Sequence, residues 1–125
     1  MSEESNGIVK VSDDVIAVTA GIAAAKVEGV ASLVGGMTDN ITKNILRMNV
    51  TKGVKISRSE EPDFFVIDIF INVYYGYKIP DVAWEIQENV KKEVKELTGE
   101  TTKAVNIHVL GVEFKETVAD DEGEK

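Results

Sequence analysis

The stretch "FVIDIFINVYYGYKIPDVAWEIQENV", residues 65–90, contains a strand pattern, a turn and a helix pattern in succession. Apolar residues alternate with other residues from Phe65 to Tyr74, which predicts a strand with one face in the core and the other face partly exposed to solvent. This split is typical of a sheet whose helices all lie on one side, because a sheet covered on both faces has apolar residues throughout its strands.

The aromatic and polar residues at the end of that strand form a joint rather than an active site. Gly76 tolerates the backbone angles that end a strand, and Pro80 suits the first turn of a helix. An apolar stripe at helical spacing follows, and Gly99 supplies a stop after it. The predicted stripe consists of Ile79, Val82, Ala83, Ile86, Val90, Val94 and Leu97.

Four further elements are predicted around this unit. The run "GVKISRSE", residues 53–60, pairs with the strand above through a turn built on Pro62. The run "AVNIHVLGVEF", residues 104–114, is a last strand in which Gly111 marks a bulge. At the N-terminus, "GIVKV", residues 7–11, has the pattern of a short strand, and Ser12 caps a helix that follows.

We therefore expect an α+β fold with the order β-α-β-β-α-β, as in split βαβ folds. Two main helices cover one face of a four-stranded mixed sheet in a two-layer sandwich, and the long helix joins two parallel strands. A short helix is expected near Asp39–Arg47, within the loop 29–52, since a structureless loop of that length is uncommon. Residues 7–115 form a single domain between a disordered tail, 1–6, and an acidic disordered tail, 116–125.

Composition narrows the class of protein. The chain has 125 residues, a net charge of -8 and no cysteine, so neither a disulfide framework nor a thiolate site is expected. Its hydropathy shows no membrane-spanning segment, which predicts a cytoplasmic protein. The two tails together hold seven acids and one lysine, so most of the negative charge lies outside the predicted domain.

No catalytic or metal-binding constellation is visible in the sequence. His108 is the single histidine, and a lone histidine on a strand is more often structural than catalytic. The carboxylates are scattered, without the spacing of a zinc or calcium site. We expect a protein that is not an enzyme, with no catalytic residues, no metal and no cofactor.

Candidate interaction residues lie on two surfaces. Trp84 falls on the polar face of the long helix, where it either covers the stem of Lys91 or Glu88, packs under the loop 29–52, or anchors self-association or the binding of a partner. Phe70, Tyr74 and Leu110 are predicted on the open face of the sheet. Paired aromatics on such a face can bind RNA, but Asp68 interrupts them, and nucleic-acid binding is the weaker interpretation.

A basic window between residues 40 and 59 carries five cations and no acid. Its members are Lys43, Arg47, Lys52, Lys55 and Arg58. It either contacts an anionic partner, such as an acidic protein or lipid headgroups, or is a solvated basic edge whose charges keep other strands from pairing with the outer strand of the hairpin.

Four stretches together resemble the alkaline shock protein and general stress protein family of Gram-positive and related bacteria. These are "AGIAAAKVEGVASLVG", "NVTKGVKI", "VYYGYKIPDVAWEIQENVKKEV" with the following "TG", and "VNIHVLGVEF". The resemblance covers residues 9–114 and departs from the family pattern at Trp84, where a polar residue is usual.

The resemblance implies a non-enzymatic cytoplasmic protein of the stress response and of cell-envelope homeostasis. Such a protein is expected to be a homo-oligomer and to be held at the membrane by a membrane-spanning partner. One branch of the family is linked instead to fatty-acid synthesis, so a regulatory partner of those enzymes is an alternative function. An RNA-binding module is a second alternative.

Overall fold

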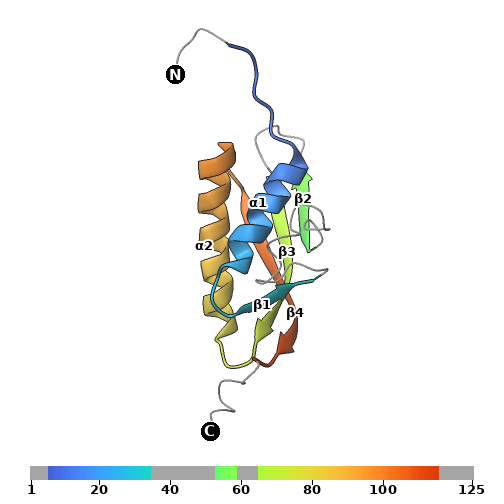
Figure 1. Cartoon of the computed structure of the whole chain (residues 1–125), viewed down its shortest axis with the longest axis vertical. Helices are drawn as coiled ribbons and strands as arrows, with labels where there is room; N and C mark the ends of the chain where they lie inside the picture. The colour runs from blue at the N-terminus through green and yellow to red at the C-terminus, as the bar shows by residue number, and fades with distance from the viewer. Residues whose placement is uncertain (1–5, 35–52, 59–64, 116–125) are drawn as a thin grey trace.

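The computed structural model describes residues 6–34, 53–58 and 65–115 (Figure 1). The elements in chain order are α1 (Asp13–Ala25), β1 (Val30–Leu33), β2 (Val54–Arg58), β3 (Phe65–Tyr74), α2 (Ile79–Thr98) and β4 (Ala104–Glu113). Two helices and a four-stranded sheet confirm the predicted α+β class.

β3 is the centre of the sheet. β2 pairs antiparallel with its first half and β1 pairs antiparallel with its end, so these two short strands share one side of β3. β4 runs parallel to β3 along the other side, and the chain reaches it through α2. The predicted mixed sheet and the parallel strands joined by the long helix are confirmed.

The prediction of a strand at residues 7–11 is wrong. These residues belong to no strand, and Ile8 and Val9 are 80% and 90% exposed. The fourth strand is Val30–Leu33, in the segment predicted as a loop, so the order is α-β-β-β-α-β. Residues 7–11 and residues 30–33 are both short apolar runs with the same local pattern. Only the second run pairs with a strand: Val30 and Leu33 lie opposite Val73 and Ile71 of β3. The helix predicted near Asp39–Arg47 lies outside the described residues.

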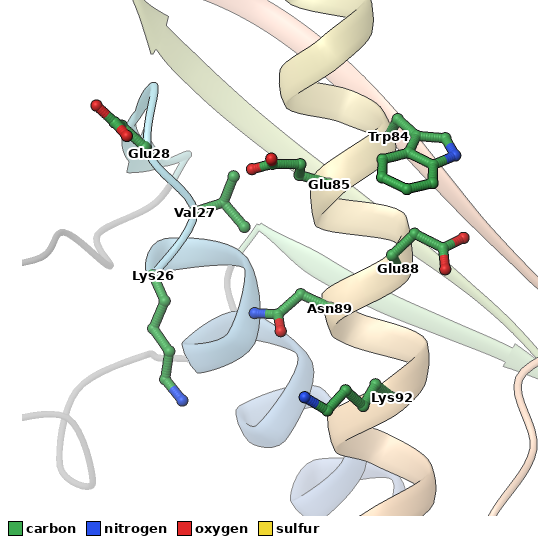
Figure 2. Close-up of a pocket in the computed structure, with 8 residues that line it drawn as sticks. All are labelled: Lys26, Val27, Glu28, Trp84, Glu85, Glu88, Asn89 and Lys92. Carbon is green, nitrogen blue, oxygen red and sulfur yellow. The ribbon is translucent and has the colours of Figure 1, made fainter.

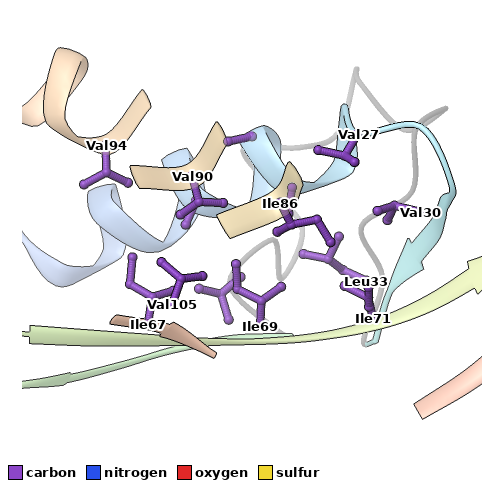
Figure 3. Close-up of a cluster of buried hydrophobic side chains, with 14 of the residues drawn as sticks. Val27, Val30, Leu33, Ile67, Ile69, Ile71, Ile86, Val90, Val94 and Val105 are labelled. Atoms are coloured by element: carbon purple, nitrogen blue, oxygen red, sulfur yellow. The ribbon is translucent and has the colours of Figure 1, made fainter. Parts of the chain in front are cut away.

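The core lies between the sheet and the two helices (Figure 3). The predicted alternation in β3 is confirmed, since every second residue from Phe65 to Val73 is buried and the residues between them are half-buried. Helix α1 contributes mainly alanines, including Ala20 and Ala23, which let it pack closely. Ser12 caps it as predicted, its hydroxyl accepting a hydrogen bond from the Val15 amide at 3.2 Å.

Helix α2 buries only the middle of its predicted stripe. Val82, Ile86, Val90 and Val94 are buried. In contrast, Ile79 and Leu97 are 42% and 72% exposed, so their assignment to the apolar core face is wrong. They occupy the first and last turns of the helix. The predicted stop is confirmed: Gly99 adopts φ +81° and its amide donates to the Lys95 carbonyl.

The predicted bulge is present in β4. Ile71 lies opposite Val109 but Asn72 lies opposite Gly111, which leaves Leu110 as the extra residue. A Cβ at position 111 would lie 2.7 Å from the side-chain oxygen of Asn72, so the Asn72 side chain would have to move to accommodate it. After the bulge the pairing with β3 resumes and continues to Glu113, which lies opposite Tyr74.

Candidate interaction surfaces

The described ranges contain no group of three histidine, cysteine or acidic side chains placed to hold a metal ion. Neither helix in those ranges is both long and apolar enough to cross a membrane. The candidate residues that the structure describes lie on the open face of the sheet, on the outer side of α2, along β2 and at the β4 bulge.

The open face of the sheet carries a cluster that spans β3 and β4. Because Asp68 lies opposite Asn106 and Phe70 lies opposite His108, the parallel register places the four side chains together. The Asp68 carboxylate accepts from Asn106 Nδ2 at 3.1 Å and lies 2.9 Å from His108 Nε2. The His108 and Phe70 rings are stacked, with centroids 4.4 Å apart.

This cluster lowers the pKa of Asp68 below its ordinary value of 3.8. The hydrogen bond from His108 is the main cause. Partial burial opposes it, and the hydrogen bond from Asn106 and the positive charge of Lys55 act in the same direction as His108. His108 therefore has a structural role in holding a carboxylate that interrupts the face.

The same cluster weakens the RNA-binding interpretation. Phe70 lies on the open face, as predicted, but one side of its ring is covered by the His108 imidazole. A base stacks on a ring only where the ring face is accessible. The Asp68 carboxylate lies beside this pair of rings, and its negative charge repels phosphate.

Tyr74 belongs to a separate group at the far end of β3. The Lys115 ammonium lies 5.3 Å from the ring centroids of both Tyr74 and Tyr77. It also donates to the Tyr77 hydroxyl at 3.1 Å, and that hydroxyl donates to Glu28 at 3.2 Å. The hydrogen bond to Tyr77 is the largest cause of a raised Lys115 pKa. Phe70 and Tyr74 therefore belong to two different clusters of side-chain contacts.

Trp84 stands on the outer surface of α2 and is 60% exposed. This confirms that it is not a core residue. It borders two shallow depressions, one of about 410 Å3 toward the turn after α1 and one of about 310 Å3 toward β4. Figure 2 shows the first, with Val27 and Glu28 lying across from α2. Its lining is mostly charged, including Glu85, Glu88 and Lys92.

Leu110 is 62% exposed at the β4 bulge. Leu110 was predicted as a candidate interaction residue, and it belongs to a group of exposed apolar residues at this end of the sheet whose other members were not predicted as candidates. The others are Val112 at 51%, Phe114 at 74% and Tyr75 at 71%. The Tyr75 and Phe114 rings lie 5.3 Å apart. In the sequence, Val112 and Phe114 continue the apolar alternation of β4 past Gly111.

The basic window can be placed only in part. Lys43, Arg47 and Lys52 lie outside the described residues. Arg58 pairs with Asp13 at 2.9 Å and lies 5.1 Å from the Phe65 ring centroid, so it ties β2 to the start of α1. Lys55 is exposed and lies opposite Asp68. Lys55 and Arg58 therefore place two positive charges on β2, on one side of the sheet.

Comparison with known proteins gives the family. A profile of the alkaline shock protein 23 family, which is described as having a cell envelope-related function, matches residues 1–114. No solved structure matches the chain. The description names a cellular role and no catalytic activity.

Three relatives support this match. The protein YqhY of Bacillus subtilis is 35% identical over 108 residues, which cover 86% of this chain and 78% of YqhY. Spy1535 of Streptococcus pyogenes is 36% identical over 122 residues, covering 97% and 91% of the two chains. YloU of Bacillus subtilis is 34% identical over 108 residues, covering 85% and 88%. The resemblance drawn from the sequence is confirmed, and the chain belongs to the alkaline shock protein 23 family, whose function is related to the cell envelope.

Proposed function

We propose that this chain acts without catalysis, as a self-associating cytoplasmic protein of the stress response. It contributes to cell-envelope homeostasis through protein contacts at or near the membrane, where a membrane-spanning protein holds it. The family's envelope-related function supports the cellular role.

The observation that carries the proposal is the placement of large apolar side chains outside the core. Trp84, Leu110 and Phe114 are each at least 60% exposed, and none of them belongs to the buried core cluster. Exposed apolar patches and exposed tryptophans are typical of surfaces that bind other proteins. Trp84 also borders a depression beside β4, so it and this strand can take part in one contact.

The charge distribution is compatible with a protein partner. The charged depression between α2 and the turn after α1 includes Lys26, Glu28, Glu85 and Lys92. Mixed charges of this kind favour orientation of a complementary protein rather than attraction to an anionic polymer. This is why the protein-contact function is preferred to RNA binding.

Two measurements test the proposal. Sedimentation velocity of the full chain over a range of concentrations should show a sedimentation coefficient that rises with concentration. Capture of the tagged full chain from membrane and soluble fractions should recover a membrane-spanning protein. A chain that stays monomeric throughout would overturn self-association.

The capture experiment also separates the alternative functions. Recovery of a subunit of a fatty-acid synthesis enzyme, without a membrane protein, would favour a regulatory role in lipid synthesis. Association that nuclease treatment abolishes would favour RNA binding. Either result would replace the proposed function.

A further inference from the structure

We infer that Glu28, Tyr74 and Tyr77 form a binding site for a lysine side chain of a partner protein. Lys115 of this chain occupies the site when no partner is bound. The site lies where the turn after α1, the end of β3 and the turn before α2 meet. This inference rests on the proposed function, because it names the chemistry by which the chain would recognise its partner.

The first observation is that an ammonium group already lies against the two tyrosines. The Lys115 Nζ atom is 5.3 Å from each ring centroid, within the range of cation–π attraction. It donates a hydrogen bond to the Tyr77 hydroxyl at 3.1 Å, and that hydroxyl donates to Glu28 Oε2 at 3.2 Å. Two aromatic rings, a hydroxyl acceptor and a nearby carboxylate are groups that recognise an alkylammonium ion.

The tyrosines are held by the fold, whereas the lysine that touches them lies outside the sheet. The Tyr74 amide donates to the Gly29 carbonyl at 2.9 Å, and both tyrosines are half-buried. Lys115 is exposed and lies two residues beyond the end of β4. A lysine from a partner can therefore replace the Lys115 ammonium without a change in the sheet.

Two depressions adjoin the site. The first has a volume of about 400 Å3 and is lined by residues 25–30 together with Tyr74, Tyr77 and Lys115. The second, of about 260 Å3, lies toward the start of α2. Glu28 and Tyr77 line both depressions, so a segment bound at the site can contact both.

The second depression has an excess of negative charge. Among the residues that the structure describes there, Glu28, Asp81 and Glu85 are acidic and Lys78 is basic. Glu85 extends from α2 toward the turn that carries Glu28 (Figure 2). Charge complementarity therefore favours a partner segment with a second cation near the first.

This chemistry fits a membrane-spanning partner. The cytoplasmic loops of membrane proteins carry an excess of lysine and arginine close to the membrane. Anionic lipid headgroups, in contrast, would be repelled by the carboxylates of Glu28, Asp81 and Glu85. The observations therefore favour a cationic protein segment over direct contact of this surface with a lipid bilayer.

NMR titration of the full chain with a synthetic peptide tests the site. The probe is acetyl-Gly-Lys-Gly-Lys-Gly-amide, and the same peptide with glutamine in place of both lysines is the control probe. Lys115→Gln vacates the site, so it should lower the dissociation constant of the lysine peptide about 2- to 5-fold, as expected for one exposed cation–π contact. Lys91→Gln makes the same change in net charge beside β4 and should leave the constant unchanged.

A second variant and a direct signal check where the peptide binds. Glu28→Gln changes an exposed residue, and in the Lys115→Gln background it should reverse the gain in affinity. The lysine ε-methylene protons of the bound peptide should shift upfield, because the ring currents of Tyr74 and Tyr77 shield groups that lie over the rings. Far-UV circular dichroism checks that each variant is folded.

Three outcomes would overturn the site. An equal gain in affinity in Lys115→Gln and Lys91→Gln would mean that net charge alone attracts the peptide. Equal binding of the glutamine peptide would mean that the ammonium group is not recognised. A lower sedimentation coefficient of Lys115→Gln than of the wild type would mean that Lys115 occupies the site of a second copy.

The outcomes also separate this inference from the proposed function. The expected peptide binding would support the site even where capture recovers no membrane-spanning protein, and that combination would overturn only the membrane contact in the proposed function. Equal capture of a membrane-spanning protein by the wild type and by Glu28→Gln, without a peptide response, would overturn only the lysine site.

Discussion

His108 Nε2 lies 2.9 Å from Oδ1 of Asp68, across the parallel pair β3 and β4. Because a carboxylate only accepts, the histidine N–H donates, and the negative charge of Asp68 is stabilised. The folded-state pKa of Asp68 is therefore below its ordinary value of 3.8.

The first prediction follows from the sign of this shift. A carboxyl group with a depressed folded pKa stabilises the protein above pH 3.8, and this contribution is lost as the pH falls through the folded pKa. Replacing His108 with alanine should raise the Asp68 pKa toward 3.8 and lower the free energy of unfolding at neutral pH by about 1 kcal/mol.

Carbon-13 NMR titration of the Asp68 carboxyl group and urea unfolding at several pH values measure the two effects. Asp68→Asn is the control, because it removes the titrating group: its free energy of unfolding should vary less with pH below about 4 than that of the wild type. An unchanged Asp68 pKa in His108→Ala would show that Asn106 and Lys55 are enough to keep this pKa below its ordinary value.

The second prediction concerns two glycines with nearly the same backbone angle. Gly29 has φ +103° and Gly76 has φ +102°, so alanine is strained at both positions by about 1–2 kcal/mol. An added Cβ at Gly29 would lie 2.8 Å from Val82 Cγ2 and 3.1 Å from the Tyr77 ring, whereas one at Gly76 meets no described atom within 4 Å.

Gly29→Ala should therefore be less stable than Gly76→Ala by about a further 1–3 kcal/mol, the usual cost of overpacking. Thermal and urea unfolding of the two variants provide the comparison. Equal destabilisation would mean that α2 moves away from Gly29 at little cost.

The contrast between residues 7–11 and β1 shows what sequence patterns determine. Both segments are short apolar runs, and nothing local distinguishes the one that finds a partner. β3 was predictable because its alternation continues over ten residues, and the start and end of α2 were predictable from Pro80 and Gly99.

The candidate surface was predictable to a similar extent. The helical spacing alone places Trp84 away from the buried side, and it is exposed. The contact between Asp68 and His108 depends on the register of two strands that are 38 residues apart along the chain, counted from Asp68 to Asn106. Neither strand contains that register by itself, so the cluster could not be predicted.

The third prediction separates the middle of the α2 stripe from its end. Ile86 is fully buried, whereas Leu97 is 72% exposed, although both belong to the periodic pattern. Ile86→Ala should lower the free energy of unfolding by about 2–5 kcal/mol, since it leaves a cavity between α2 and the sheet.

Leu97→Ala should change the free energy of unfolding by no more than about 0.5 kcal/mol, as is usual at exposed positions. Urea unfolding at a protein concentration where the chain is monomeric gives both values. A loss above about 2 kcal/mol in Leu97→Ala would show that this side chain is covered in solution.

The last prediction concerns the tie between α1 and β2. The Arg58 guanidinium lies 2.9 Å from the Asp13 carboxylate, with both side chains partly exposed at 35% and 52%. Exposed pairs of this kind contribute at most about 1 kcal/mol and are screened by salt. Asp13→Asn should therefore destabilise the domain slightly in low salt.

Asp14→Asn is the matched control, because Asp14 lies in the same first turn and has a similar interaction with the helix dipole. The difference in free energy of unfolding between the two variants isolates the contact with Arg58. It should be about 0.5 kcal/mol at low ionic strength and should approach zero in about 1 M salt, where the Debye length is about 3 Å. A difference that is absent at low salt would mean that Arg58 is available to an anionic partner, which would restore it to the basic interaction surface predicted from the sequence.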